Sequence, residues 1–218
     1  MLRLRLLAGL VGPVLFTVVT LVEGLTRPGY NPLVQLISEL ALTQRGWVES
    51  ANFVVSGTLL VVFSGGLRRM IKGGRAATWG PRWVAIAGTA LAAAGVFVID
   101  PSPIYPPGAV PTRSWHGLLH QVAGPVMFLG LTLTAFVYAR RVARPYGMTV
   151  GVLIIALFFV GTNAMVTLSY AGAWPSAPAG LLESASAYLG LGWIATLAVH
   201  LLRQLPVAQD PRPASASP

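Results

Sequence analysis

The sequence contains no cysteine and has few charged residues. The absence of cysteine excludes disulfide bonds, thiolate catalysis and cysteine-ligated metal sites. Only 10% of the 218 residues are charged and 55% are hydrophobic, whereas a typical soluble domain carries about 25% charged residues. The mean hydropathy is +0.70. This composition predicts an integral membrane protein.

The sequence also has no Walker phosphate-binding loop, Gly-rich dinucleotide fingerprint, Gly-x-Ser-x-Gly elbow or His-Glu-x-x-His motif. These absences set aside the best-marked nucleotide-dependent enzymes, serine hydrolases and zinc proteases. The apolar stretches lack the chain of charged residues expected of an ion or proton pathway, and the sequence has no clear inverted halves. Both observations disfavour a transporter.

Six stretches approach the length of about 20 mostly apolar residues that a membrane-spanning helix needs. They are residues 6–25, 48–67, 82–99, 117–138, 148–169 and 182–202. With short loops they account for residues 1–205, so the sequence predicts one all-α domain, a bundle of six transmembrane helices. Residues 206–218 are rich in Pro, Ala and Ser, and we expect them to form a disordered cytoplasmic tail.

Acidic residues are scarce, and their positions differ from those of the basic residues. Five of the six acids lie at or beyond one set of helix ends: Glu23, Glu39, Glu49, Asp100 and Glu183. Twelve of the fifteen Lys and Arg residues lie at the other set. By the positive-inside rule, both termini are predicted to be cytoplasmic in a multi-pass protein of the cell membrane. The net charge of +9 therefore indicates topology and not a nucleic-acid partner.

The first loop on the acidic side predicts a short helix. Asn31 suits an N-cap and Pro32 suits the first helical position. Apolar residues then recur at helical spacing, and Ser38 and Glu39 lie off that stripe. We expect a short amphipathic helix on the outer surface, with Ser38 and Glu39 solvated or facing a ligand.

His116 and His120 are spaced so that both lie on one face of a helix. Two imidazoles at this spacing can bind one divalent metal ion, with Asp100 or Glu39 as a third ligand. Two other roles remain open, namely hydrogen bonds to loop carbonyls or carboxylates, and general acid–base work by one histidine oriented by Asp100. Asp100 itself ends a predicted helix, where the dipole disfavours an acid, so it either pairs with Arg113 or a histidine or forms a plain Asp-Pro turn.

Asn163 is predicted to be the most buried polar side chain, with Tyr170 on the same helix face. An amide inside a span usually faces the bundle interior, where it bonds a neighbouring helix or a ligand. The candidate ligand-binding residues are therefore Ser38, Glu39, Asn163 and Tyr170.

Short motifs spread over most of the chain resemble those of a known family. They are Gly29-Tyr30-Asn31-Pro32, Ser38-Glu39-Leu40, Gly46, Asn52-Phe53, Gly57, Gly95-Val96-Phe97, Asp100-Pro101, Pro106-Pro107-Gly108, and His116 with His120. In their order and spacing the sequence resembles the uncharacterised bacterial membrane family catalogued as domain of unknown function 998. The resemblance implies several membrane spans and supplies no activity.

Two functions are compatible with these observations. The first is binding of a lipid, a lipophilic small molecule or a partner protein through an outward-facing polar pocket. The alternative is a membrane-embedded enzyme of the lipid hydrolase or isoprenoid cyclase type, with acid–base or metal-assisted chemistry at Glu39, Asp100, His116 and His120. The enzyme requires at least three of these four side chains near one point. Small-residue helix faces can pack within one bundle or between subunits, so the oligomeric state stays open.

Overall fold

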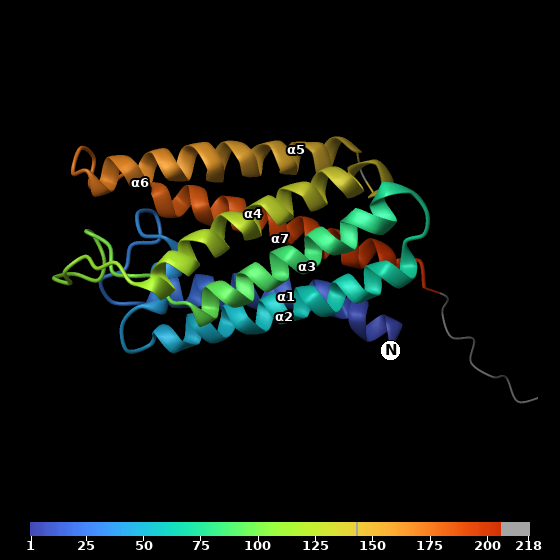
Figure 1. The fold of residues 1–218 in the computed structure, drawn as a ribbon, viewed down its shortest axis with the longest axis horizontal. Helices are drawn as coiled ribbons and strands as arrows, with labels where there is room; N and C mark the ends of the chain where they lie inside the picture. Colours follow the sequence, from blue (N-terminus) through green and yellow to red (C-terminus); the bar gives the residue numbers. More distant parts are fainter. Residues whose placement is uncertain (143, 206–218) are drawn as a thin grey trace, which may run out of the picture.

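The computed structural model describes residues 1–142 and 144–205, which are mostly helical and contain no strand. The helices are α1 (Leu2–Thr26), α2 (Gly46–Met70), α3 (Gly74–Val96), α4 (Trp115–Val142), α5 (Arg144–Ile154), α6 (Asn163–Tyr170) and α7 (Ala179–Arg203). A π-helical segment, Ile155–Thr162, joins α5 to α6, and a 3-10 helix, Ile37–Ala41, follows α1. Figure 1 shows the long helices side by side along one axis. The prediction of an all-α fold is confirmed, and the predicted tail, residues 206–218, lies outside the described residues.

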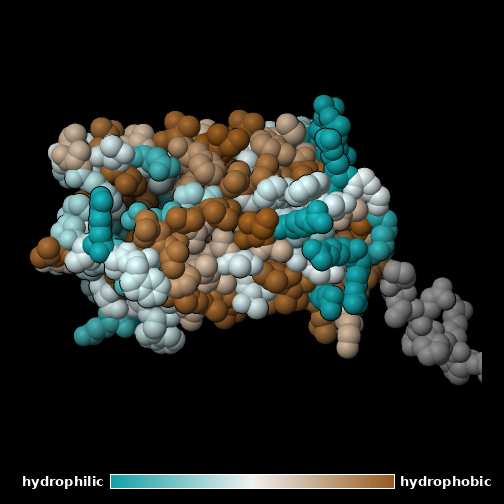
Figure 2. Space-filling view, viewed as in Figure 1, coloured by the Kyte–Doolittle hydropathy of each residue, from teal (hydrophilic) through white to brown (hydrophobic). Residues whose placement is uncertain are grey.

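Five helical stretches in the described part are long and apolar enough to cross a membrane. They are Leu2–Thr26, Gly46–Met70, Trp115–Val142, Arg144–Tyr170 and Ala179–Arg203. The predicted stretch 82–99 corresponds to α3, which is not among them: Arg75, Pro81 and Arg82 lie in its first half, and the helix ends at Val96. Figure 2 shows hydrophobic residues across the middle of the visible face and hydrophilic residues at both ends.

Close backbone contact between α2 and α3 depends on glycine. A Cβ atom on Gly88 would lie 2.6 Å from the carbonyl oxygen of Gly57, and a Cβ on Gly57 would collide with the carbonyl oxygen of Gly88. Two helical turns after Gly88, a Cβ on Gly95 would lie 2.6 Å from the carbonyl oxygen of Ser50. Small residues let membrane helices approach closely, so these glycines serve packing within the chain. Gly124 and Gly192 face open space instead.

The loops at residues 27–45, 97–114 and 171–178 meet at one end of the bundle, which we call the acidic end. It lies on the left in Figure 1, opposite the N-terminus. The acids of the described part lie at this end, in the loops or in the adjoining helix turns: Glu23, Glu39, Glu49, Asp100 and Glu183. Basic residues occupy the last turns of α2 and α4 at the other end: Arg68, Arg69, Arg140 and Arg141.

The first acidic-end loop differs from the predicted surface helix. Only the five residues Ile37–Ala41 are helical, in a 3-10 turn, and every one of them is buried. The loop packs across the start of α7, where the N–H groups of Gly180 and Leu181 donate to the carbonyls of Val34 and Leu33 at 3.1 Å. Because these long-range bonds satisfy the loop backbone, a longer surface helix does not form. The expectation that Ser38 and Glu39 are solvated is wrong.

Candidate functional site

Two carboxyl groups meet under the first acidic-end loop. The N–H of Leu36 donates to Glu39 Oε2 at 2.8 Å, and the N–H of the next residue, Ile37, donates to Glu183 Oε2 at 2.6 Å. Two successive backbone amides thus hold two carboxyls from segments far apart in the sequence. On the other oxygen, the hydroxyl of Tyr170 donates to Glu39 Oε1 at 3.5 Å. We call this group the carboxyl pair.

The carboxyl pair has no basic partner among the described residues. Glu39 is 0% exposed. Burial raises the pKa of Glu39 above its ordinary value of 4.5, and hydrogen bonds from Ser102, Leu36 and Tyr170 only partly oppose this rise. The site therefore favours a neutral acid on Glu39 more than water does.

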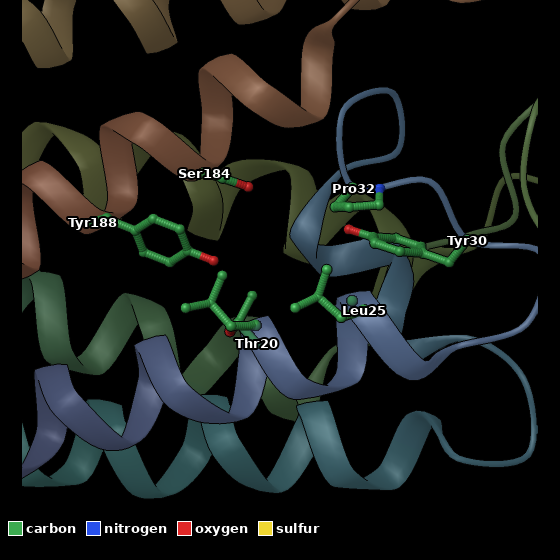
Figure 3. Close-up of a pocket in the computed structure, with 8 residues that line it drawn as sticks. Thr20, Leu25, Tyr30, Pro32, Ser184 and Tyr188 are labelled. Atoms are coloured by element: carbon green, nitrogen blue, oxygen red, sulfur yellow. The ribbon is translucent and has the colours of Figure 1, made fainter.

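A small pocket lies beside the carboxyl pair, between α1 and α7. Its volume is about 50 Å³. Figure 3 shows the hydroxyl groups of Tyr30, Ser184 and Tyr188 pointing toward it above Thr20. A water molecule needs about 10–15 Å³ by this measure. The pocket therefore has room for a few water molecules and is too small for a lipid.

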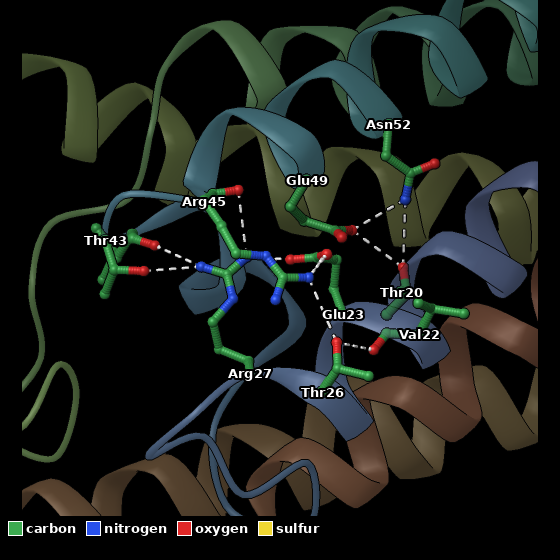
Figure 4. A network of polar contacts seen from close by, with 10 residues as sticks. Thr20, Val22, Glu23, Thr26, Arg27, Thr43, Arg45, Glu49 and Asn52 are labelled. Atoms are coloured by element: carbon green, nitrogen blue, oxygen red, sulfur yellow. Dashed lines mark hydrogen bonds and ion pairs between the residues drawn. The ribbon is translucent and has the colours of Figure 1, made fainter.

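A second polar group joins α1 to the start of α2 (Figure 4). Glu23 accepts ion-paired hydrogen bonds from Arg27 and Arg45. Arg27 also donates to the carbonyls of Leu42 and Arg45, at 3.1 and 3.2 Å, and to Thr43 Oγ1 at 2.7 Å. Its guanidinium thereby fastens the end of the loop to α1. The spacing of Glu23 and Arg27 in the sequence is the signal that predicts such a pair.

Glu49 lies next to this group and has no such ion pair. Thr20 Oγ1 and Asn52 Nδ2 each donate to Glu49 Oε1 at 3.0 Å. Glu49 is 0% exposed, and its Oε2 has no hydrogen-bond partner in the described part. Sequence reasoning placed Glu49 only at or beyond a helix end and missed this burial between α1 and α2.

The third polar group fastens the start of α4 to the end of α3. Asp100 accepts from the N–H of Ser114 at 2.8 Å and from its hydroxyl at 2.6 Å, and Ser114 Oγ in turn accepts from the N–H of Gly117 at 3.0 Å. A Cβ atom on Gly117 would collide with the Asp100 carboxylate. Burial, the largest single influence, opposes the charge on Asp100, but the two bonds from Ser114 together with the nearby His116 and His120 lower its pKa below the ordinary value of 3.8.

The two histidines bond to backbone carbonyls at the end of α3. His116 Nδ1 lies 3.0 Å from the carbonyl oxygen of Val98, and His120 Nδ1 lies 2.9 and 2.8 Å from those of Ala94 and Phe97. The last carbonyls of a helix lack partners within it, so the rings occupy acceptors that would otherwise be unsatisfied. Of the roles considered for the two histidines, the structure contains the hydrogen bonds to backbone carbonyls. Asp100 lies near both rings, and no ion pair joins it to Arg113 in the described part.

The predicted catalytic residues fall into two separate groups. Within residues 1–142 and 144–205, no hydrogen bond joins Glu39 to Asp100, His116 or His120. In the same residues, no three His, Asp or Glu side chains are placed to hold a metal ion. Glu39 therefore lies apart from the other three candidates in the hydrogen-bond network, and Asp100 lies near both histidine rings.

None of the four predicted ligand-binding residues lines the small pocket. Asn163 is exposed on the outside of the bundle, and its amide donates to the carbonyl of Phe158 at 2.9 Å. The prediction that Asn163 is the most buried polar side chain is wrong: its amide bonds to carbonyls of its own helical segment, Phe158 and Phe159, and not to a neighbouring helix. Ser38 is buried in the 3-10 helix at 5% exposure. Of the four, only Glu39 and Tyr170 share a hydrogen bond in the described part.

A groove between α3 and α4, much larger than the small pocket, was missed by sequence reasoning. Its volume is about 430 Å³. Its lining consists of Ala85, Ile86, Thr89, Ala90, Ala93, Phe97, Leu119, Val122, Ala123 and Val126. Alanine at four of these positions leaves the space unfilled, and Thr89 is the only polar side chain among the lining residues. The signal was the run of small residues in α3, which the sequence alone assigned to close packing.

The apolar spans, their hydrophobic outer surface and the charged groups at both ends define a multi-pass membrane protein. The chain belongs to the family described as protein of unknown function DUF998, whose model matches residues 10–200. This confirms the resemblance found in the sequence motifs. Comparison with curated proteins and with solved structures gave no match.

Proposed function

We propose that this protein binds a lipid or another lipophilic small molecule in the groove between α3 and α4. The observation that carries the proposal is the volume of about 430 Å³ in that groove, against about 50 Å³ in the polar pocket at the acidic end. Small-molecule sites in proteins occupy about 300–1,000 Å³ and are mostly apolar. The proposed binding site is therefore the groove beside the acidic end, and not the small polar pocket within that end.

The position of the groove fits a membrane ligand. Its lining runs along α3 from Ala85 to Phe97, which at a rise of 1.5 Å per residue is about 18 Å. One leaflet of the hydrocarbon core is about 15 Å thick. A single lipid chain can therefore lie in the groove with its polar end at the acidic end of the bundle.

The proposal includes an orientation in the cell membrane. We infer that α3 is a sixth span, because its 23 residues pack along α2 and α4 over the same depth. The basic loops and both termini would face the cytoplasm and the acidic end would face outward. Since the chain has no cysteine, Gly73→Cys and Thr112→Cys each give one reactive thiol. In intact cells an impermeant maleimide should label only Thr112→Cys. Labelling of Gly73→Cys alone would show that the orientation is opposite to the one proposed.

Lipid retention tests the binding function. Native mass spectrometry of detergent-purified protein should show bound lipid, and Ala93→Leu should reduce the bound fraction because Leu fills the groove. Ala164→Leu is the matched control, since Ala164 is exposed on α6 away from the groove. Equal retention by both variants and the wild type would refute the groove as the binding site.

A further inference from the structure

The bonds of the two histidines fix which ring nitrogen carries the hydrogen. A carbonyl oxygen can only accept, so His116 Nδ1 donates to Val98 and His120 Nδ1 donates to Ala94 and Phe97. In a neutral imidazole with hydrogen on Nδ1, the other nitrogen, Nε2, is a hydrogen-bond acceptor. The two rings therefore each present an acceptor and no further donor.

His116 continues the line of groove residues toward the acidic end. It lies three residues, about one helical turn, before Leu119, the first α4 residue of the groove. Its ring packs edge-on against Trp115 at 5.7 Å between centroids, and Trp115 packs against Phe97 at 6.0 Å. Phe97 also lines the groove. His116 is only partly buried, whereas His120 is buried, so His116 is the more accessible of the two rings.

The charge beside this acceptor restricts the polar group that fits. The Asp100 carboxylate lies at the start of the same helix, bonded to Ser114. An anionic head group placed at His116 would meet this negative charge, and like charges at short range are unfavourable. A neutral hydrogen-bond donor meets no such penalty.

We propose that the groove takes a lipophilic molecule whose polar end is a hydroxyl group, and that this hydroxyl donates a hydrogen bond to His116 Nε2. Long-chain and isoprenoid alcohols and diacylglycerols belong to this class. The inference rests on the proposed binding function and adds the chemistry of the ligand's polar end. His116 then acts as the residue that determines specificity, and the groove supplies the affinity for the chain.

A matched pair of ligands isolates the hydrogen bond. A radiolabelled long-chain alcohol is bound to purified protein in nanodiscs and displaced by the unlabelled alcohol, by its methyl ether or by the fatty acid of the same length. The ether keeps the chain and the oxygen but has no hydrogen to donate. In the wild type the alcohol should bind about two- to tenfold more tightly than the ether, the effect of one neutral hydrogen bond, and more tightly than the acid.

His116→Ala should remove the preference for the alcohol and leave the affinity for the ether unchanged. The unchanged ether affinity also shows that the variant is folded. His200→Ala, at the end of α7, is the control and should keep the preference. Equal affinities for alcohol and ether in the wild type, a preference retained in His116→Ala, or tighter binding of the fatty acid would overturn this inference. In those cases, specific binding of the radiolabelled alcohol that is present in the wild type and lost in Ala93→Leu would still support the groove as the binding site. Binding that is absent, or that Ala93→Leu leaves unaltered, would overturn the proposed function itself.

Discussion

Replacement of Glu23 by Gln should destabilise the fold by more than any other change in the acidic-end loops. The side chains of Glu23 and Arg27 are 5% and 3% exposed. Gln keeps the volume of Glu but removes its charge, so the guanidinium of Arg27 stays buried without a counter-ion. Breaking a buried pair in this way costs about 3–5 kcal/mol. Because Arg27 keeps its bonds to Leu42, Thr43 and Arg45, we expect the lower value, about 3 kcal/mol.

Arg45→Gln is the matched control, since it removes the other ion pair of the same carboxylate. The Arg45 side chain is 47% exposed, and pairs at such positions contribute about 0–1 kcal/mol. Unfolding of the purified proteins in mixed micelles with increasing SDS, followed by the helical circular dichroism signal, measures both free energies. The reasoning is refuted if Glu23→Gln is no more destabilising than Arg45→Gln.

Two further predictions concern helix packing and acidity. Gly88→Ala should destabilise the protein by about 1–3 kcal/mol in the same assay, because the added Cβ meets the Gly57 backbone. Gly192 faces open space, so Gly192→Ala should leave the free energy of unfolding unchanged. Equal effects of the two substitutions would contradict the close α2–α3 contact. Burial raises the pKa of Glu39, so the wild type should gain stability as the pH falls through that raised pKa toward 4.5, where the neutral form is present in both states. Glu39→Gln should reduce this gain in unfolding measured across a pH series, since Glu183, the other carboxyl of the pair, is retained, and an unchanged pH dependence would show that Glu39 does not contribute to it.

The helices were predictable because each span must be apolar over a length set by the membrane. That constraint acts within about 20 consecutive residues, so the local sequence is enough to predict each span. The gathering of acids at one end also followed from the sequence. The groove did not, because alanines that line a hollow and alanines that pack tightly look the same in a sequence, as Ala93 in the groove and the fully buried Ala87 illustrate.

The carboxyl pair could be predicted only in part. Tyr170 and Glu39 were both candidates, but the bond between Ile37 and Glu183 joins residues 146 apart in the chain, and no local pattern encodes it. The pattern of His116 and His120 fits a metal ion as well as it fits carbonyls. Which of the two partners the histidines have depends on where α3 ends. In this structure the carbonyls of Ala94, Phe97 and Val98 accept hydrogen bonds from the two rings.

Photolabelling tests the central claim, a lipophilic ligand in the groove between α3 and α4, most directly. A long-chain alcohol with a photoreactive diazirine in its chain is irradiated with the protein in nanodiscs, and labelled peptides are located by mass spectrometry. We predict labels concentrated in residues 85–97 and 119–126, which line the groove. Labels spread evenly over exposed apolar residues elsewhere, such as Val18, Val152 and Val160, would contradict the claim.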